Sequence, residues 1–324
     1  MGVSVVLTAY LLAVPIDLAR LSLDLQAIKE TSPRPRECAE ASPASGWQRA
    51  GNAEITQYCL ALAKGYASLR EEPKLALEQA RLLEPKHPRR LEARVLEARA
   101  LVTLGQFEAA LAVFLEVERD APRLLRGAEV TLAMARAAAK VGNGRVADGA
   151  YRSLVPQSGL LSRAVDQRQV FLEAALAALA VGEGDAPRVL AYLDEARRAH
   201  PAGRLDTLTS LVSALLELAR GDRVAAKRWV EGFELPLWLT LEEGPEAQFE
   251  VDETTRTASV AFVVPEEQSE MPWLPQGARV ALAATWYELA ARGPEAAYSS
   301  LAWQMLLEGA AGEGWKRVAE RVRR

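Results

Sequence analysis

The chain has 324 residues, 50% of them hydrophobic and 25% charged, with a net charge of −4 and a pI near 5.6. A slightly acidic chain lacks the basic footprint of nucleic-acid-binding domains, so neither DNA nor RNA is expected as a partner. The chain is longer than a domain with one compact core usually is. An array of repeating units can reach this length, because it needs no single core.

Residues 1–30 are predicted to form an apolar segment followed by an amphipathic helix. The uncharged run from Gly2 to Ile16 has 15 residues, fewer than a membrane-spanning helix needs. It lacks a preceding Lys or Arg and a clear cleavage site, so it is a poor secretory signal. Two interpretations remain open, a short membrane anchor or a buried helix or strand that caps the helices that follow.

Residues 31–50 are rich in Pro, Ser and Arg and are predicted to form a linker or an ordered loop. The chain has two cysteines, Cys38 in this linker and Cys59 in the next predicted helix. They permit one disulfide, which would imply an oxidising compartment; the alternative is two unrelated thiols, one exposed and one buried.

Residues 51–236 carry a repeating pattern. Pro88 and Pro122 lie 34 residues apart, and each closes a predicted pair of helices. Glycines that end the first helix of a pair are expected in the left-handed conformation, which glycine adopts without steric cost. The best copy contains Ala98, Gly105, Phe107, Ala110, Phe114 and Pro122, and the corresponding glycines of later copies are Gly142, Gly184 and Gly221.

This pattern resembles the consensus of the tetratricopeptide repeat (TPR) family. The resemblance implies an all-α fold, a right-handed α-solenoid of TPR-like helix pairs, with five repeats between residues 51 and 236. It also implies a groove, lined by the first helix of each pair, that binds another protein. Carried onto the second and third repeats, the family's groove positions are Val95, Arg99, Thr103, Leu132, Arg136 and Lys140.

Arg99 and Arg136 occupy equivalent groove positions in adjacent repeats. Two neighbouring arginines could grip a partner's carboxylate with paired hydrogen bonds. The alternative is that each arginine pairs with a nearby glutamate of the chain itself, such as Glu97 or Glu129.

In the fourth and fifth repeats the groove positions become apolar. Such a surface suits an amphipathic partner helix, or it is filled by the carboxy-terminal hairpin of the chain itself. These positions are Phe171, Ala174, Ala178, Leu208, Val212 and Leu215.

The carboxy-terminal third departs from the repeat. Residues 237–276 are predicted to be an acidic β-hairpin insertion with strands at Phe249–Asp252 and Thr257–Val264. Its charges form either a solvated face or a site for a basic partner. Residues 277–324 are predicted to form an atypical helix pair and a cap helix. Six of the seven tryptophans lie beyond residue 228, which indicates either a binding surface or the packing of a core.

The residue types predict no catalytic, cofactor-binding or metal-binding site. His87 and His200 each precede a repeat-ending proline, where they suit a helix end. The expected function is a non-enzymatic scaffold or adaptor that holds a partner's peptide or amphipathic helix in the groove. The expected setting is a multi-protein complex of a bacterial-type envelope, on the periplasmic side, with membrane association through residues 1–16; the alternative location is the cytoplasm.

The sequence leaves two other functions open. One is a regulatory or lid subunit of a separate enzyme. The other, a glycan-processing enzyme on a helical scaffold, requires clustered carboxylates around a cleft.

Overall fold

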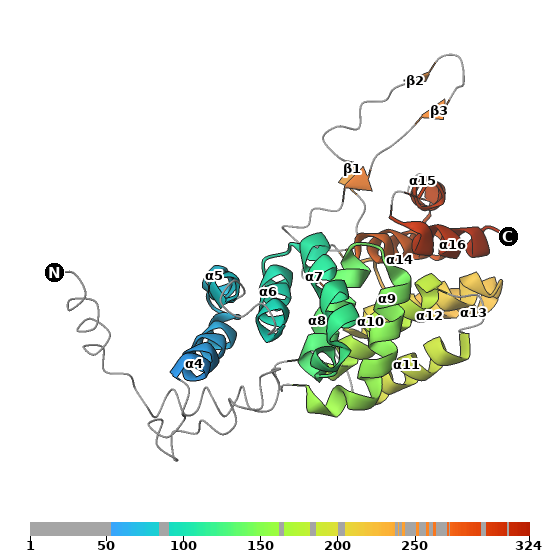
Figure 1. Cartoon of the computed structure of the whole chain (residues 1–324). Coiled ribbons are helices and arrows are strands. Elements are labelled where there is room, and N and C mark those ends of the chain that lie inside the picture. Colours follow the sequence, from blue (N-terminus) through green and yellow to red (C-terminus); the bar gives the residue numbers. More distant parts are fainter. Residues whose placement is uncertain are drawn as a thin grey trace, which may run out of the picture. The chain divides into compact units, whose positions relative to one another are not determined.

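Figure 1 shows the chain as a computed structural model. It describes residues 53–83, 91–161, 165–181, 186–199, 205–236, 239, 242–243, 251–252, 257–258, 262–263, 271, 273–292, 296–309 and 311–324. The predicted anchor, amphipathic helix and linker of residues 1–50 lie outside the described residues.

The described residues are overwhelmingly helical, which confirms the predicted all-α class. The chain divides into two compact units, residues 1–130 and 131–324. The boundary falls inside helix α8 (Ala128–Lys140).

The amino-terminal unit contains two complete helix pairs. The first pair is α4 (Ala53–Ser68) with α5 (Pro73–Leu83), and the second is α6 (Glu92–Thr103) with α7 (Phe107–Asp120), followed by the 3₁₀-helix η3 (Pro122–Leu125). Each α-helix packs on the next one along the chain. Gly65 allows α4 and α6 to approach closely, because a Cβ atom there would lie 2.4 Å from Cδ2 of Leu96.

The carboxy-terminal unit continues the succession of helices. After α8 come α9 (Gly144–Leu154), the 3₁₀-helix η4 (Val155–Leu160), α10 (Gln167–Val181), α11 (Ala186–Ala199), α12 (Leu205–Ala219) and α13 (Arg223–Val230). The last three are α14 (Gln276–Leu289), α15 (Ala296–Leu307) and α16 (Glu313–Val322). We call α4, α6, α8, α10 and α12 the first helices, and α5, α7, α9, α11 and α13 the second helices.

The same turn joins first to second helices at three places. Gly105, Gly142 and Gly221 have φ angles of 75°, 75° and 80°, as the sequence predicts. At each turn the amide after the glycine bonds a carbonyl five residues earlier, for example Asn143 to Ala138 at 2.8 Å. This is the Schellman arrangement, which satisfies carbonyls left open at a helix end. The fourth predicted glycine, Gly184, lies outside the described residues.

Small and aromatic residues of the repeat pattern form the core between helices. Ala98, Ala110 and Phe114 are fully buried in the amino-terminal unit. Their counterparts in the carboxy-terminal unit are also buried: Ala135, Ala147, Tyr151, Ala177, Leu193, Ala214, Ala226 and Val230. The recurring alanines let paired helices approach closely, and the larger side chains fill the remaining space.

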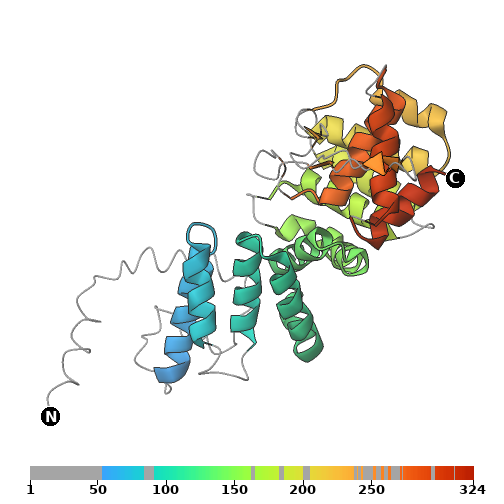
Figure 2. The same cartoon turned by 90° about the horizontal axis from the view of Figure 1, so that it is seen from above.

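Helices α14 and α16 pack on the first helices of their own unit. Helix α16 contacts α10, α12, α14 and α15, and α14 contacts α12. In Figure 2 these helices, orange to red, lie against the green and yellow helices of the same unit. Trp303 and Trp315 are buried, as a core role requires, whereas Trp229 of α13 is 37% exposed.

The predicted hairpin insertion is not confirmed. In the described part of residues 237–276, strand structure is limited to two-residue pairs: β1 (Glu242–Glu243) with β4 (Phe262–Val263), and β2 (Val251–Asp252) with β3 (Thr257–Ala258). A two-stranded hairpin is marginal in water without a packed face, so β-branched composition alone overestimated regular strand here.

Candidate functional site

The predicted groove residues of the amino-terminal unit differ in accessibility. Val95 is fully buried, so its side chain is closed to a partner in this structure. Thr103 is exposed, and its hydroxyl donates to the carbonyl of Arg99 at 3.1 Å. The Arg99 guanidinium lies 4.0 Å from a Glu129 carboxylate oxygen and 5.6 Å from the ring centre of Tyr66. Thr103 is therefore the exposed residue of this predicted surface, and the Arg99 side chain is 18% exposed.

The equivalent residues of the carboxy-terminal unit are bound within the chain. Leu132 is 3% exposed. Arg136 binds Glu173 through both Nε and a terminal nitrogen, with the shortest distance 2.8 Å. Lys140 donates to the carbonyl of Leu274 at 3.1 Å. These three positions are therefore engaged inside the unit rather than offered to a partner.

Polar pairs connect successive first helices. Each joins a side chain of one first helix to a side chain of the next first helix. The pairs are Tyr58 with Glu92 at 3.4 Å, Arg99 with Glu129 at 4.0 Å, Arg136 with Glu173 at 2.8 Å, and Arg168 with Asp206. The arginines that the sequence offered for a partner's carboxylate thus lie beside carboxylates of their own chain.

Glu173 is the centre of the densest polar cluster. Its side chain is 3% exposed. Besides Arg136, it accepts hydrogen bonds from the Tyr151 hydroxyl and from the Gln169 amide, each at 2.6 Å. Burial raises the pKa of Tyr151 well above its ordinary value, and the negative charge of Glu173 adds to the rise. Through Glu173, these hydrogen bonds connect α8, α9 and α10.

Sequence reasoning missed Glu173 as the partner of Arg136, which lies 37 residues away. One signal was available. Glu173 is the single acidic residue of α10, a helix with 12 buried residues. A lone buried carboxylate requires a partner, which the pattern of repeats alone does not identify.

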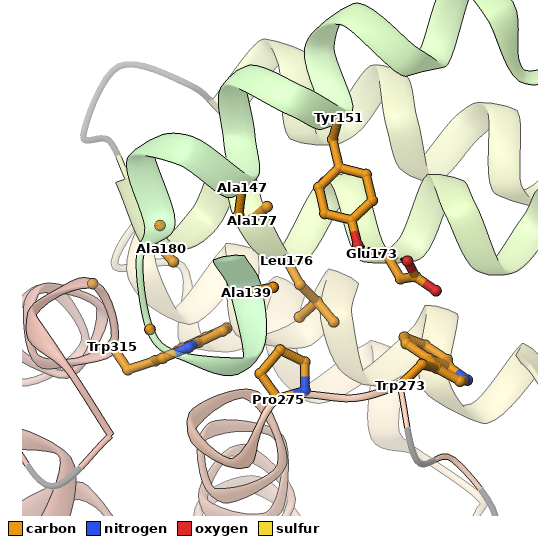
Figure 3. Close-up of a pocket in the computed structure, with 13 residues that line it drawn as sticks. Ala139, Ala147, Tyr151, Glu173, Leu176, Ala177, Ala180, Trp273, Pro275 and Trp315 are labelled. Atoms are coloured by element: carbon orange, nitrogen blue, oxygen red, sulfur yellow. Dashed lines mark hydrogen bonds between the residues drawn. The ribbon is translucent and has the colours of Figure 1, made fainter. Parts of the chain in front are cut away.

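A small cavity lies beside this cluster. Figure 3 shows Tyr151 and Glu173 on one side of it, and Trp273 and Trp315 entering from the carboxy-terminal segments. Its remaining walls are mostly small residues, among them Ala139, Gly144, Ala177 and Gly314. The cavity has a volume of about 20 Å³, which is room for a water or two.

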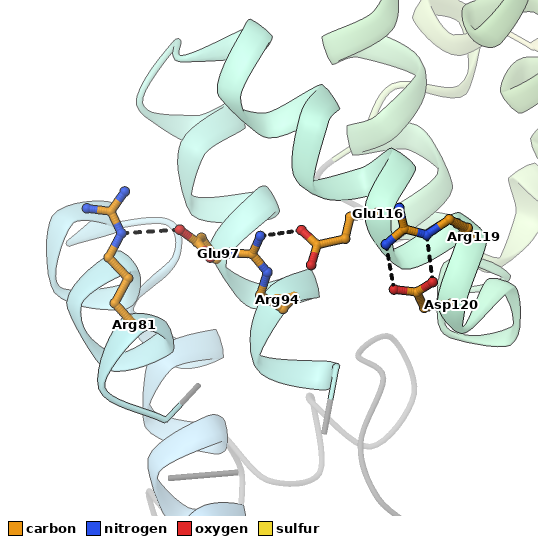
Figure 4. Close-up of polar contacts among 6 residues, drawn as sticks. All are labelled: Arg81, Arg94, Glu97, Glu116, Arg119 and Asp120. Carbon is orange, nitrogen blue, oxygen red and sulfur yellow. Dashed lines mark hydrogen bonds and ion pairs between the residues drawn. The ribbon is translucent and has the colours of Figure 1, made fainter. Parts of the chain in front are cut away.

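A chain of ion pairs crosses three helices of the amino-terminal unit. Arg81 of α5 binds Glu97 of α6 at 3.2 Å, and Arg94 of α6 binds both Glu97 and Glu116 of α7 (Figure 4). The Glu97 side chain is 8% exposed, so Arg81 and Arg94 neutralise a carboxylate that is nearly removed from water. These contacts link the two helix pairs and explain a buried acid without invoking catalysis.

The remaining predicted sites include residues that the structure does not describe. Cys59 is buried in α4, but Cys38 lies outside the described residues, so their disulfide stays a prediction. His87 and His200 also lie outside them. Among the residues that are described, no group of three His, Cys, Asp or Glu side chains could hold a metal ion. None of the described helices is long and apolar enough to cross a membrane.

No family model matches the chain, and no significant match was found among curated proteins or solved structures.

Proposed function

We propose that the protein is a non-enzymatic scaffold built from TPR-like helix pairs in a right-handed α-solenoid, which holds a peptide or helix of a partner protein. The observation that carries the proposal is the recurring turn at Gly105, Gly142 and Gly221, with the same left-handed glycine and the same hydrogen bonds. Recurring helix pairs bury their apolar faces against neighbours and leave extended surfaces for partners.

In the amino-terminal unit the predicted surface carries the less tightly paired arginine. The Arg99 side chain is 18% exposed and lies 4.0 Å from Glu129, whereas Arg136 binds Glu173 at 2.8 Å, so Arg99 exchanges its carboxylate partner more readily. Thr103 lies one turn further along the same face of α6 and is exposed. A partner carboxylate that reaches Arg99 is the chemistry this surface suits.

In the carboxy-terminal unit the corresponding face is occupied. The apolar positions of α10 and α12 are buried, and both helices contact α16. This supports assigning initial partner recognition to Arg99 and Thr103. Membership of an envelope complex and a periplasmic location rest on residues 1–50 and remain part of the same proposal. The alternative is a regulatory or lid subunit of a separate enzyme, with the enzyme as the partner.

The test compares two surface variants of the full chain. Proteins cross-linked to the parent in its native cell are identified by mass spectrometry and then quantified for Arg99→Ala with Thr103→Glu. We expect selective loss of a partner, because Arg99→Ala removes attraction for a carboxylate and Thr103→Glu adds repulsion. The matched control is Arg119→Ala, whose side chain is 73% exposed on the second helix α7. A partner set that is identical for all three chains would refute recognition by this face.

A further inference from the structure

Helix α16 is amphipathic, and its apolar side packs on other helices of its unit. Its apolar side carries Trp315, Val318 and Ala319, which are 5%, 0% and 0% exposed. Its opposite side carries Glu313 and Arg317, which are exposed. The apolar side packs on α10, α12 and α14 of the same unit. An amphipathic helix laid on the first helices is the geometry by which helix-binding grooves hold their targets.

Helix α16 approaches α10 and α14 most closely at two glycines. A Cβ atom at Gly314 of α16 would lie 2.9 Å from the Ala180 carbonyl oxygen of α10. A Cβ atom at Gly277 of α14 would lie 2.3 Å from Cδ1 of Trp315. The first contact demands a glycine from the occupant, and the second shows that the surface is shaped around a tryptophan. We call the surface on which α16 packs the α16 seat. It is formed by α10, α12 and α14 and includes Ala180 and Gly277.

A polar contact fixes the orientation of the occupant. The Arg321 guanidinium donates to the carbonyl of Leu179, in the last turn of α10. Carbonyls in the last turn of a helix have no amide partner within that helix, and they carry the negative end of its dipole. An arginine two turns after the glycine therefore completes the recognition pattern.

Two glycines lie between α15 and α16 in left-handed conformations. Gly309 and Gly312 have φ angles of 85° and 88°. Both glycines occupy conformations that glycine adopts freely, so other conformations of the connection carry little backbone strain.

We propose that α16 is an internal occupant of a helix-binding seat, and that the seat takes a partner's helix of the same pattern in its place. That pattern is a glycine followed by tryptophan, apolar residues three and four positions after the tryptophan, and arginine six positions after it. The inference rests on the proposed scaffold function and names the class of partner for the carboxy-terminal unit. While α16 is seated, this surface is closed.

A labelled peptide of residues 309–324 tests the seat in the full chain by fluorescence anisotropy. In the parent, α16 competes at the millimolar effective concentration of a tethered ligand, so the added peptide binds weakly. Trp315→Ala in the chain weakens the internal competitor and leaves the seat intact. We expect this variant to bind the peptide at least about tenfold more tightly than the parent.

Two controls make the result specific. Trp229→Ala removes a tryptophan that is 37% exposed on α13, and it should bind the peptide as weakly as the parent. A peptide carrying Gly314→Val should bind neither chain, because the Ala180 carbonyl leaves no room for the side chain. A Trp315→Ala chain with parental helix content that binds the original peptide no more tightly than the parent would overturn the inference.

Hydrogen exchange of the unmodified protein keeps the inference testable if Trp315→Ala does not fold. Amides of α16 should exchange before those of α10 and α14, because α16 opens alone. Equal exchange in the three helices would show that α16 is a fixed part of the core, and the inference would be wrong. Either negative result leaves recognition by Arg99 and Thr103 untouched, so the two proposals fail separately.

Discussion

At the scale of single residues, the buried acids Glu97, Asp148 and Glu173 each bind an arginine from another helix. Glu173 shows why such a match matters, because its carboxylate is nearly removed from water while Arg136 stays 27% exposed. Removing the arginine leaves a buried negative charge with only the neutral donors Tyr151 and Gln169.

Arg136→Ala should therefore lower the free energy of unfolding by about 2–3 kcal/mol, measured by chemical denaturation. Replacing an exposed surface arginine with alanine should instead change the free energy of unfolding by no more than about 0.5 kcal/mol. Arg119→Ala provides that comparison, since Arg119 is exposed. Adding Glu173→Gln to Arg136→Ala should recover part of the loss, because no charge then remains to be neutralised; no recovery would contradict the role assigned to the pair.

The exposed pair Arg119 and Asp120 gives a prediction about pH. Hydrogen bonding to Arg119, at 2.7 and 2.9 Å, lowers the pKa of Asp120. A lowered folded-state pKa means that the interaction is complete above the ordinary carboxyl pKa and is lost as the pH falls through the folded-state value. In an NMR titration, Arg119→Ala should return the Asp120 pKa toward about 3.9. An unchanged titration would show that the pair does not persist in solution.

At the scale of elements, the turns of the repeats were predictable and the helix contacts were not. Gly105, Gly142 and Gly221 could be recognised from sequence because a left-handed helix end selects glycine locally. Gly277 carried no such signal, because its need for a small residue comes from Trp315, which is distant in sequence. The partner of Arg136 was missed for the same reason, and the hairpin was overestimated because strand propensity depends on packing.

Two glycines in helices of the carboxy-terminal unit should respond oppositely to alanine. A Cβ atom at Gly149 of α9 meets nothing within 4 Å, so Gly149→Ala should stabilise by about 0.5–1 kcal/mol through helix propensity. Gly277→Ala should instead destabilise by about 1–3 kcal/mol, because the buried Trp315 ring must move. Thermal unfolding of both variants measures the difference. Equal stabilisation would mean that α14 and α16 are less closely packed than described.

At the scale of the whole molecule, the state of the two cysteines tests the proposed periplasmic location. If Cys38 and Cys59 form a disulfide, reduction should lower the free energy of unfolding by about 2–4 kcal/mol. Protein from its native cell should then show no alkylatable thiol in non-reducing mass analysis. A Cys38→Ser and Cys59→Ser double variant is the control, since reductant should not affect it. Two alkylatable thiols in the native protein would remove the main support for export.

The three equivalent turns differ in what surrounds them. A Cβ atom at Gly105 or Gly221 would meet nothing within 4 Å, whereas one at Gly142 would lie 3.8 Å from Cα of Gly312. The open turns, one in each unit, are therefore suitable places to insert a fluorescent reporter beside the glycine. A pair of such reporters would follow the unfolding of each unit separately, while the Gly142 turn, with another backbone segment against it, should reject the same insertion.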